Sequence, residues 1–166
     1  VGLARYLGVK EHEVSFGPST SQNTYVLSQA FGEWLVPGNA IIVTNQDHEA
    51  NTGAWRRLSN RGVLVKEWKV NKETGELNLE DLVNLLDEHV KLVCFPHCSN
   101  IVAHINPVKE IISLVHSAGA YVCVDGVSYA PHGLPNVRNI GADIYLFSSY
   151  TVSYTHLRAH ETSKHL

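Results

Sequence analysis

The stretch KLVCFPHCSNIVAHINPVKEIISLVHSAGAYVCVDG, residues 91–126, contains one complete unit of strand, helix and strand. Its two apolar runs, Leu92–Phe95 and Tyr121–Val124, are continuous rather than alternating, which is typical of strands covered on both faces. Between them, Asn106–Pro107 predicts the start of a helix and Gly119 predicts its end. This order predicts two parallel strands joined by a right-handed crossover.

The same alternation of strands and helices continues on both sides of this unit. Three further apolar runs predict strands at Ala40–Thr44, Val63–Trp68 and Ile144–Phe147. Helices are predicted at Ser21–Val36, Ala54–Asn60 and Leu79–Leu86, the last of them capped by Asn78. The sequence therefore predicts an α/β fold of three layers, α/β/α, with a mostly parallel sheet.

The composition is that of an ordinary globular protein. The chain has 166 residues, enough for one domain with a real core, and a formal net charge of -3, which argues against a nucleic-acid partner. No apolar run reaches membrane-spanning length. Cys94, Cys98 and Cys123 lack the spacing of a disulfide framework or a metal site, so we expect reduced thiols, no metal and a cytoplasmic protein.

Polar residues follow four of the predicted strands. They are Asp47–Asn51, Ser99–Asn100, Asp125 and Ser148–Tyr150. In open parallel sheets, ligands bind beyond the carboxyl ends of the strands. These four segments therefore predict a single crevice.

Three features of this crevice each allow more than one interpretation. FGPSTS, residues 16–21, precedes the first long helix, where it is either an anion site or an ordinary Ser/Thr cap. Asp125 needs a cationic or donating partner, which is either a protonated ring nitrogen or the turn through Gly126. His48 is a general base, a metal ligand, a stacking ring or a surface histidine.

Five segments together resemble the class V aminotransferases, a family that includes the cysteine desulfurases. They are GPSTSQNTY (17–25), DHEANTGAW (47–55), HCSNIVAHINPVKEI (97–111), VDGVSYAPHGLP (124–135) and DIYLFSSY (143–150), in the order and spacing of the family. The resemblance implies the large domain of a fold type I enzyme. It further implies pyridoxal 5'-phosphate as cofactor, a small amino acid as substrate and a homodimer.

The resemblance also implies roles for individual residues. The positions expected at the cofactor phosphate are Gly17, Pro18, Ser19, Thr20, Ser148 and Tyr150. The positions expected around the ring are His48, which would stack on it, Asn100, Ser128 and Asp125. Asp125 would pair with the ring nitrogen and keep it protonated through its opposite charge.

The sequence departs from the family after Tyr150. Thr151 stands where the family has the lysine that binds the cofactor, and threonine can neither form that bond nor abstract the α-proton of the substrate. The remainder, TVSYTHLRAHETSKHL, resembles translated adaptor sequence. We therefore expect residues 1–150 to be a partial cofactor-binding domain of a truncated protein, and residues 151–166 to be a disordered, non-native tail.

Two functions from different classes follow. The first is a class V enzyme that is inactive as given because of Thr151. The second is a non-catalytic α/β module that keeps a phosphate or cofactor pocket. A nicotinamide-binding domain is disfavoured, because no G-x-G-x-x-G follows a strand.

Overall fold

The computed structural model describes residues 2–133 and 135–148, within which five strands form one sheet. Their order is β2-β1-β3-β4-β5, and every neighbouring pair is parallel. The strands are β1 (Ala40–Thr44), β2 (Leu64–Trp68), β3 (Val90–Pro96), β4 (Tyr121–Asp125) and β5 (Ile144–Leu146). This sheet confirms the predicted fold class. Tyr150 and the predicted tail at 151–166 lie outside the described residues.

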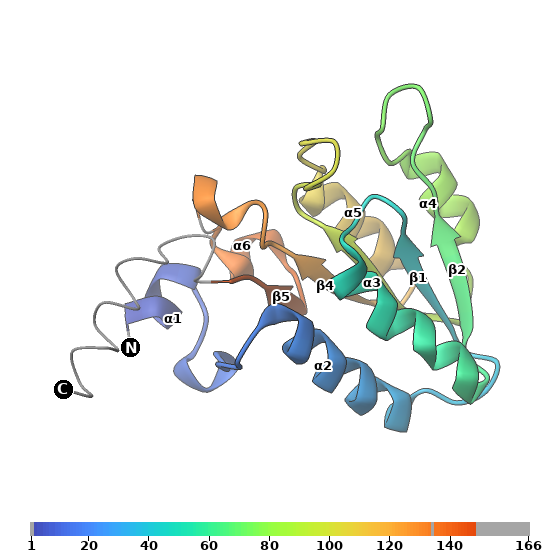
Figure 1. Cartoon of the computed structure of the whole chain (residues 1–166), viewed down its shortest axis with the longest axis horizontal. Coiled ribbons are helices and arrows are strands. Elements are labelled where there is room, and N and C mark those ends of the chain that lie inside the picture. Colours follow the sequence, from blue (N-terminus) through green and yellow to red (C-terminus); the bar gives the residue numbers. More distant parts are fainter. Residues whose placement is uncertain (1, 134, 149–166) are drawn as a thin grey trace.

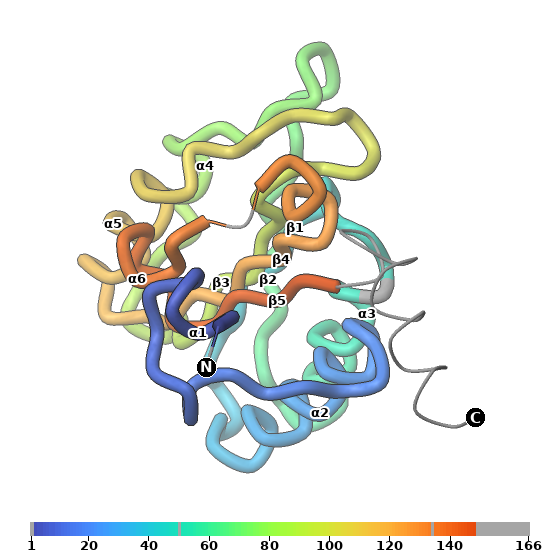
Figure 2. Tube along the Cα trace, turned by 90° about the vertical axis from the view of Figure 1, so that its left-hand side faces the viewer, coloured from blue at the N-terminus to red at the C-terminus, as the bar shows by residue number. Residues whose placement is uncertain are grey.

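Helices cover both faces of the sheet. Helices α2 and α3 lie on one side, and α4 and α5 lie on the other (Figure 1, Figure 2). The helices are α1 (Gly2–Leu7), α2 (Thr20–Trp34), α3 (Glu49–Arg56), α4 (Leu79–Leu85), α5 (Val108–Ser117) and α6 (Val137–Ile140), with 3-10 turns η1 (Glu11–Glu13), η2 (Arg57–Arg61) and η3 (Ala130–His132). No helix in the described part of the chain has the length and apolar character needed to cross a membrane.

Each face of the sheet has its own apolar core. Successive side chains of a strand point to opposite faces. Ile41 and Val43 of β1 therefore belong to the same cluster as Trp55 of α3, whereas Ile42 belongs to the cluster of Ile111 on α5. All five side chains are fully buried. Two cores separated by one sheet give the predicted three layers.

Two of the predicted helix boundaries are set by the expected local interactions. The side chain of Asn78 begins α4 by accepting a hydrogen bond from the Glu80 N–H at 2.8 Å. Gly119 follows the last turn of α5 with a φ of 77°, a conformation that side chains disfavour. The bounds of the strand at Ala40–Thr44 are those predicted, and the bounds of the other strands and long helices differ from prediction by at most two residues.

The start of α3 was predicted wrongly. The helix begins at Glu49, five residues before the predicted start at Ala54, and continues as η2. Asp47 Oδ1 accepts a hydrogen bond from the His48 N–H at 2.7 Å, and the His48 carbonyl accepts from the Asn51 N–H at 2.9 Å. The first turn is thus built from polar residues, which give no apolar periodicity from which a helix could be predicted.

The N-terminal segment lies beside the β5 end of the sheet. In both views, α1 is close to α6 and β5 (Figure 1, Figure 2). Glu13 of η1 forms an ion pair with Arg138 of α6 at 4.0 Å. The chain then passes along the sheet edge to α2, so the N-terminus of α2 reaches the carboxyl ends of the strands.

Adjacent residues of α4 offer a matched test of the packing. We expect Leu82→Ala to lower the free energy of unfolding by about 2–5 kcal/mol, because the Leu82 side chain is fully buried and its removal leaves a cavity. Val83→Ala is the control: its side chain is 50% exposed, and the change should stay within about 0.5 kcal/mol. Urea unfolding measures both values. Equal losses would contradict this account of the α4 face.

Candidate functional site

A cavity of about 380 Å³ lies at the carboxyl end of the sheet. Its lining comes from the start of α2, the start of α3, and the segments after β3, β4 and β5. The lining residues are Pro18, Ser19, Thr20, Ser21, Asp47, His48, Asn51, Cys98, Asn100, Asp125, Val127, Ser128 and Ser148. The single crevice predicted from the strand ends is therefore present.

Most of the predicted site residues line this cavity. They are Pro18, Ser19, Thr20, His48, Asn100, Asp125, Ser128 and Ser148. Gly17 instead lines a neighbouring, larger cavity of about 850 Å³ between the N-terminal segment and β5. Tyr150 lies outside the described residues. The structure thus brings the set together, while the role of each residue stays a prediction.

The N-terminus of α2 forms one side of the cavity. Ser19 caps the helix, because its Oγ accepts a hydrogen bond from the Gln22 N–H at 3.2 Å. The hydroxyl of Thr20 is buried and has no hydrogen-bond partner among the described residues. Free N–H groups and the dipole of this 15-residue helix favour an anion at this point. The cap is confirmed, and the anion site stays a prediction.

Two buried carboxylates form the opposite side. Asp125, at the end of β4, is 7% exposed, and its Oδ1 accepts a hydrogen bond from the Val127 N–H at 2.8 Å. Burial raises the pKa of Asp125, whereas the Val127 N–H and the charge of His48 lower it. The turn through Gly126 that was expected as one partner for this carboxylate is therefore present, closed by the Val127 N–H.

Asp47 is the second carboxylate, and it was not predicted as a site residue. It is 8% exposed, and its Oδ2 accepts a hydrogen bond from Asn51 Nδ2. Burial, together with the negative charge of Asp125, raises the pKa of Asp47 to about 7, against the effect of its two hydrogen bonds. In the sequence Asp47 is one of four polar residues within positions 47–51, and only the fold shows that it is buried.

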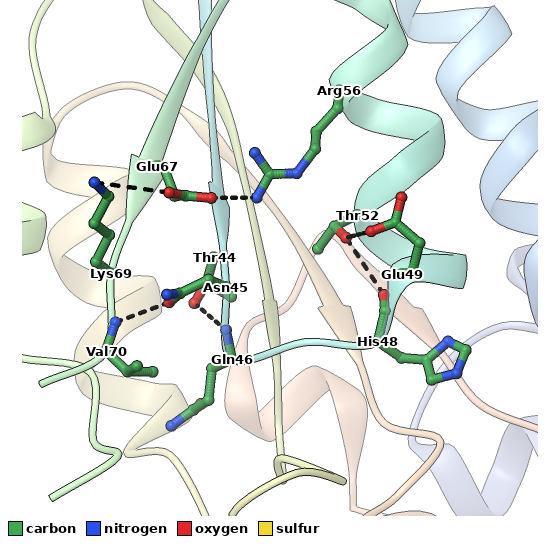
Figure 3. A network of polar contacts seen from close by, with 10 residues as sticks. All are labelled: Thr44, Asn45, Gln46, His48, Glu49, Thr52, Arg56, Glu67, Lys69 and Val70. Atoms are coloured by element: carbon green, nitrogen blue, oxygen red, sulfur yellow. Dashed lines mark hydrogen bonds and ion pairs between the residues drawn. The ribbon is translucent and has the colours of Figure 1, made fainter. Parts of the chain in front are cut away.

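The segment after β1 is held by polar contacts on the side of β2. Arg56 Nη2 of α3 lies 2.5 Å from Glu67 Oε1 of β2, and Asn45 Oδ1 accepts a hydrogen bond from the Val70 N–H at 2.9 Å (Figure 3). The imidazole of His48 extends away from these groups, and it lines the cavity (Figure 3). These contacts fix the backbone from which His48 projects.

A buried polar network joins this segment to the loop after β3. Ser99 Oγ donates to the Gln46 carbonyl at 2.9 Å, and Asn106 Nδ2 donates to Gln46 Oε1 at 2.7 Å. Ser99 Oγ also accepts hydrogen bonds from the Ile101 and Val102 N–H groups at 3.2 and 3.3 Å. The loop that presents Asn100 is therefore anchored directly to the loop that presents Asp47 and His48.

His97, together with Tyr129 and Tyr145, supports the backbone of Asp125. His97 donates its backbone N–H to the Asp125 carbonyl at 2.7 Å, and its Nδ1 lies 2.8 Å from the Tyr145 hydroxyl. Its ring stacks on Tyr129 with the ring centroids 3.6 Å apart. Burial lowers the pKa of His97 to about 4 and raises that of Tyr145, so both rings are neutral at physiological pH.

The close packing of the Tyr145 ring against residue 126 requires a glycine there. A Cβ atom built on Gly126 would lie 2.3 Å from the ring of Tyr145, and the Gly126 N–H donates to the Leu146 carbonyl at 2.6 Å. Sequence reasoning missed His97 and Tyr145, because their stacking and hydrogen bonding depend on strands that are distant in the chain. The glycine directly after Asp125 was the one available signal of close packing.

Comparison with known proteins shows which family uses such a domain. The sequence model of the family "Aminotransferase class-V" matches residues 2–151. The chain belongs to the class V aminotransferases. The resemblance seen in the five motifs is thereby confirmed, and the family is one of pyridoxal-phosphate-dependent enzymes.

Members of the family from fungi and bacteria match most of this chain. "Aminotransferase-like protein FGM3" of Gibberella zeae is 38% identical over 157 residues, which cover 93% of this chain and 39% of that protein. A cysteine desulfurase of Yersinia pseudotuberculosis is 33% identical over 83% of this chain and 34% of its own length. The chain therefore spans little more than a third of these relatives.

Solved structures agree with the fold. The apo structure of a cysteine desulfurase from Thermococcus onnurineus has a TM-score of 0.82 and 28% identity, over 88% of this chain and 36% of that one. The Escherichia coli cysteine desulfurase CsdA has a TM-score of 0.83 at 24% identity, over 90% and 38%. The five-stranded sheet is thus the fold type I domain of these enzymes.

No metal site is found in residues 2–133 and 135–148. These residues hold no group of three or more His, Cys, Asp or Glu side chains that could bind a metal ion. Cys94, Cys98 and Cys123 are buried free thiols, and Cys98 lines the cavity. The titratable side chains among the described residues of the cavity lining are Asp47, His48, Cys98 and Asp125.

The support of Asp125 can be tested at the Tyr145 hydroxyl. We expect Tyr145→Phe to lower the free energy of unfolding by about 1 kcal/mol, because it leaves the buried His97 Nδ1 without its partner. Tyr121→Phe removes a hydroxyl from a ring that is 48% exposed. It should change the free energy of unfolding by less than about 0.5 kcal/mol. Chemical denaturation measures both. An unchanged Tyr145→Phe variant would show that this hydrogen bond contributes nothing.

Proposed function

We propose that this chain binds pyridoxal phosphate in the cavity at the carboxyl end of the sheet, and that the protein to which the domain belongs acts on a small amino acid. One observation carries the proposal: a helix N-terminus suited to a phosphate and the buried carboxylate of Asp125 line the same cavity. Pyridoxal phosphate has a phosphate on one side and a basic ring nitrogen on the other, which is the charge pattern this cavity favours.

The residues present fit the cofactor. Thr20 Oγ1 and Asn51 Oδ1 are buried polar atoms without a hydrogen-bond partner among the described residues, although both side chains line the cavity. Buried polar groups normally have partners, so two such atoms in one cavity favour a polar ligand there. Ser19 and Ser148 add hydroxyls on the phosphate side, while Asn100 and Ser128 supply polar groups for the ring.

Asp125 would set the electronic state of the cofactor. When bound, pyridoxal phosphate supplies an electron sink for negative charge that develops on an amino acid. A carboxylate that is 7% exposed interacts strongly with a cation, because little water screens the pair. Asp125 would therefore hold a proton on the ring nitrogen, and His48 would cover the ring.

Thr151 limits what the chain can do as given. A hydroxyl cannot replace the lysine amine as the base that moves the α-proton, so we propose that the chain binds the cofactor without turning over an amino acid. The cysteine desulfurases among the relatives make cysteine the first substrate to test in a lysine-containing form. Those relatives favour an enzyme over a non-catalytic module.

We further propose a reducing, cytoplasmic setting and a homodimer. Cys94 and Cys123 are paired in register on β3 and β4, yet both are free thiols. Trp34 and Tyr121 are 51% and 48% exposed and line an apolar hollow of about 410 Å³ beside Phe31. An exposed apolar surface of this kind favours contact with a second copy.

Replacing Asp125 tests the ring side of the site. We expect Asp125→Asn to raise the Kd for pyridoxal phosphate by about tenfold or more, because the buried charge opposite the ring nitrogen is lost. Asp81→Asn, on the exposed first turn of α4, is the matched control and should leave the Kd unchanged. Equilibrium dialysis measures both. An unchanged Kd in Asp125→Asn would remove the central support of the proposal.

A lysine at position 151 tests the effect of Thr151 on the chemistry of the site. We expect Thr151→Lys to be labelled by pyridoxal phosphate and borohydride at residue 151, while the unmodified chain shows no specific label, because only an amine can form the reducible bond. Val152→Lys is the control for a lysine one position away. Peptide mass spectrometry locates the label. Equal labelling at 151 and 152 would argue against a cofactor held in the cavity.

A further inference from the structure

The cavity contains more acidic side chains than one ring nitrogen needs. Asp47 and Asp125 approach it from the ends of β1 and β4, and they are 8% and 7% exposed. None of the described lining residues is a lysine or arginine, and His48 is the basic side chain among them. Two carboxylates that are so little exposed to water repel each other when both are ionised, so the ionisation of one favours a proton on the other.

The position of Asp47 is fixed by two hydrogen bonds at the start of α3. Its Oδ1 accepts from the His48 N–H at 2.7 Å, and its Oδ2 accepts from Asn51 Nδ2. Asn51 is 1% exposed, and its Oδ1 has no partner among the described residues. An amide can present either a donor or an acceptor, so Asn51 can bond to Asp47 in its ionised or its protonated form.

We propose that Asp47 is a positioning residue of the cofactor site which holds a proton in the ligand-free protein, where Asp125 lines the same cavity, and loses it when a cationic ring pairs with Asp125. The proton passes to the ring nitrogen if the ring arrives unprotonated, and otherwise to water; no other bond changes. The pair exists independently of any ligand, while the loss of the proton on binding rests on the proposed function.

The titratable side chains that face Asp47 and Asp125 do not compete with these two carboxyl groups for the proton. Burial raises the pKa of the Cys94 thiol on β3, and that thiol in turn lies near Asp47 and the Cys123 thiol. Burial likewise raises the pKa of Tyr145 on β5, near Tyr129 and Asp125. The raised pKa values leave the Cys94 thiol and the Tyr145 phenol neutral at physiological pH. Besides the two acids, His48 and Cys98 are the titratable side chains among the described residues that line the cavity.

The pair has a defined effect on stability. Asp47 has an ordinary pKa of 3.8 and a pKa of about 7 in the folded chain, so the folded state binds more protons between these values. Its contribution to stability is complete below the lower value and is lost as the pH rises through the higher one. Asp47→Asn should therefore gain stability relative to the parent chain as the pH is raised from 5 to 8.

Carbon-13 NMR of the aspartate carboxyl groups, on the full chain without ligand, tests the pair directly. We expect one resonance with a midpoint near 7 that is absent in Asp47→Asn and moves down by roughly one pH unit or more in Asp125→Asn. Glu49→Gln removes an exposed charge from the same helix turn and should leave the midpoint in place. A midpoint near 4 for Asp47, or one that ignores Asp125→Asn, overturns the proposal.

Addition of pyridoxal phosphate tests the second part of the proposal, the loss of the proton from Asp47 on binding. At a pH about one unit below the Asp47 midpoint, binding should move its resonance to the ionised position. Binding that leaves Asp47 protonated overturns this half. If the titration of the pair is as expected but dialysis detects no binding, the proposed function fails and the acid pair stands. Asp47→Glu, which keeps the charge, should restore a coupled titration if Asp47→Asn does not fold.

Discussion

Parallel pairing brings the carboxyl ends of all five strands to one edge of the sheet, and the arrangement of the cavity depends on that constraint. Asp47, Ser99, Asp125 and Ser148 are far apart in sequence, yet each follows a strand that ends at this edge. Helices on both faces exclude water from the sheet and so make the edge a place where polar groups are costly to bury. The polar groups found there are therefore held by one another or face the cavity.

The electrostatic potential at this edge depends on which of its side chains are ionised. The neighbours beneath Asp125 are neutral because burial disfavours their charged forms, as the lowered pKa of His97 and the raised pKa of Tyr145 indicate. The negative charge of the region is thus concentrated in two carboxylates that face the cavity. A ligand with a cationic ring is favoured there, and an anionic group is favoured at the start of α2 on the opposite side.

Most of the fold could be predicted from the sequence, because apolar runs and capping residues act locally. The strand at Ala40–Thr44 and the cap at Asn78 are examples. The start of α3 could not, since its first turn is stabilised by the side chain of Asp47 and not by an apolar face. The grouping of the site residues followed from the strand ends, but the burial of Asp47 and the stack of His97 on Tyr129 depend on tertiary packing.

The contact between Gly126 and Tyr145 has a consequence for the order in which the domain can form during synthesis. The turn after Asp125 receives its backbone partner from Leu146 and its packing from Tyr145, and both belong to the edge strand β5. A ribosome releases these residues about twenty positions after Asp125, at a few residues per second or faster. A nascent chain that has emerged only as far as β4 already has β1, β2 and β3, but the turn after Asp125 lacks the contacts of Tyr145 and Leu146 until β5 has joined the sheet.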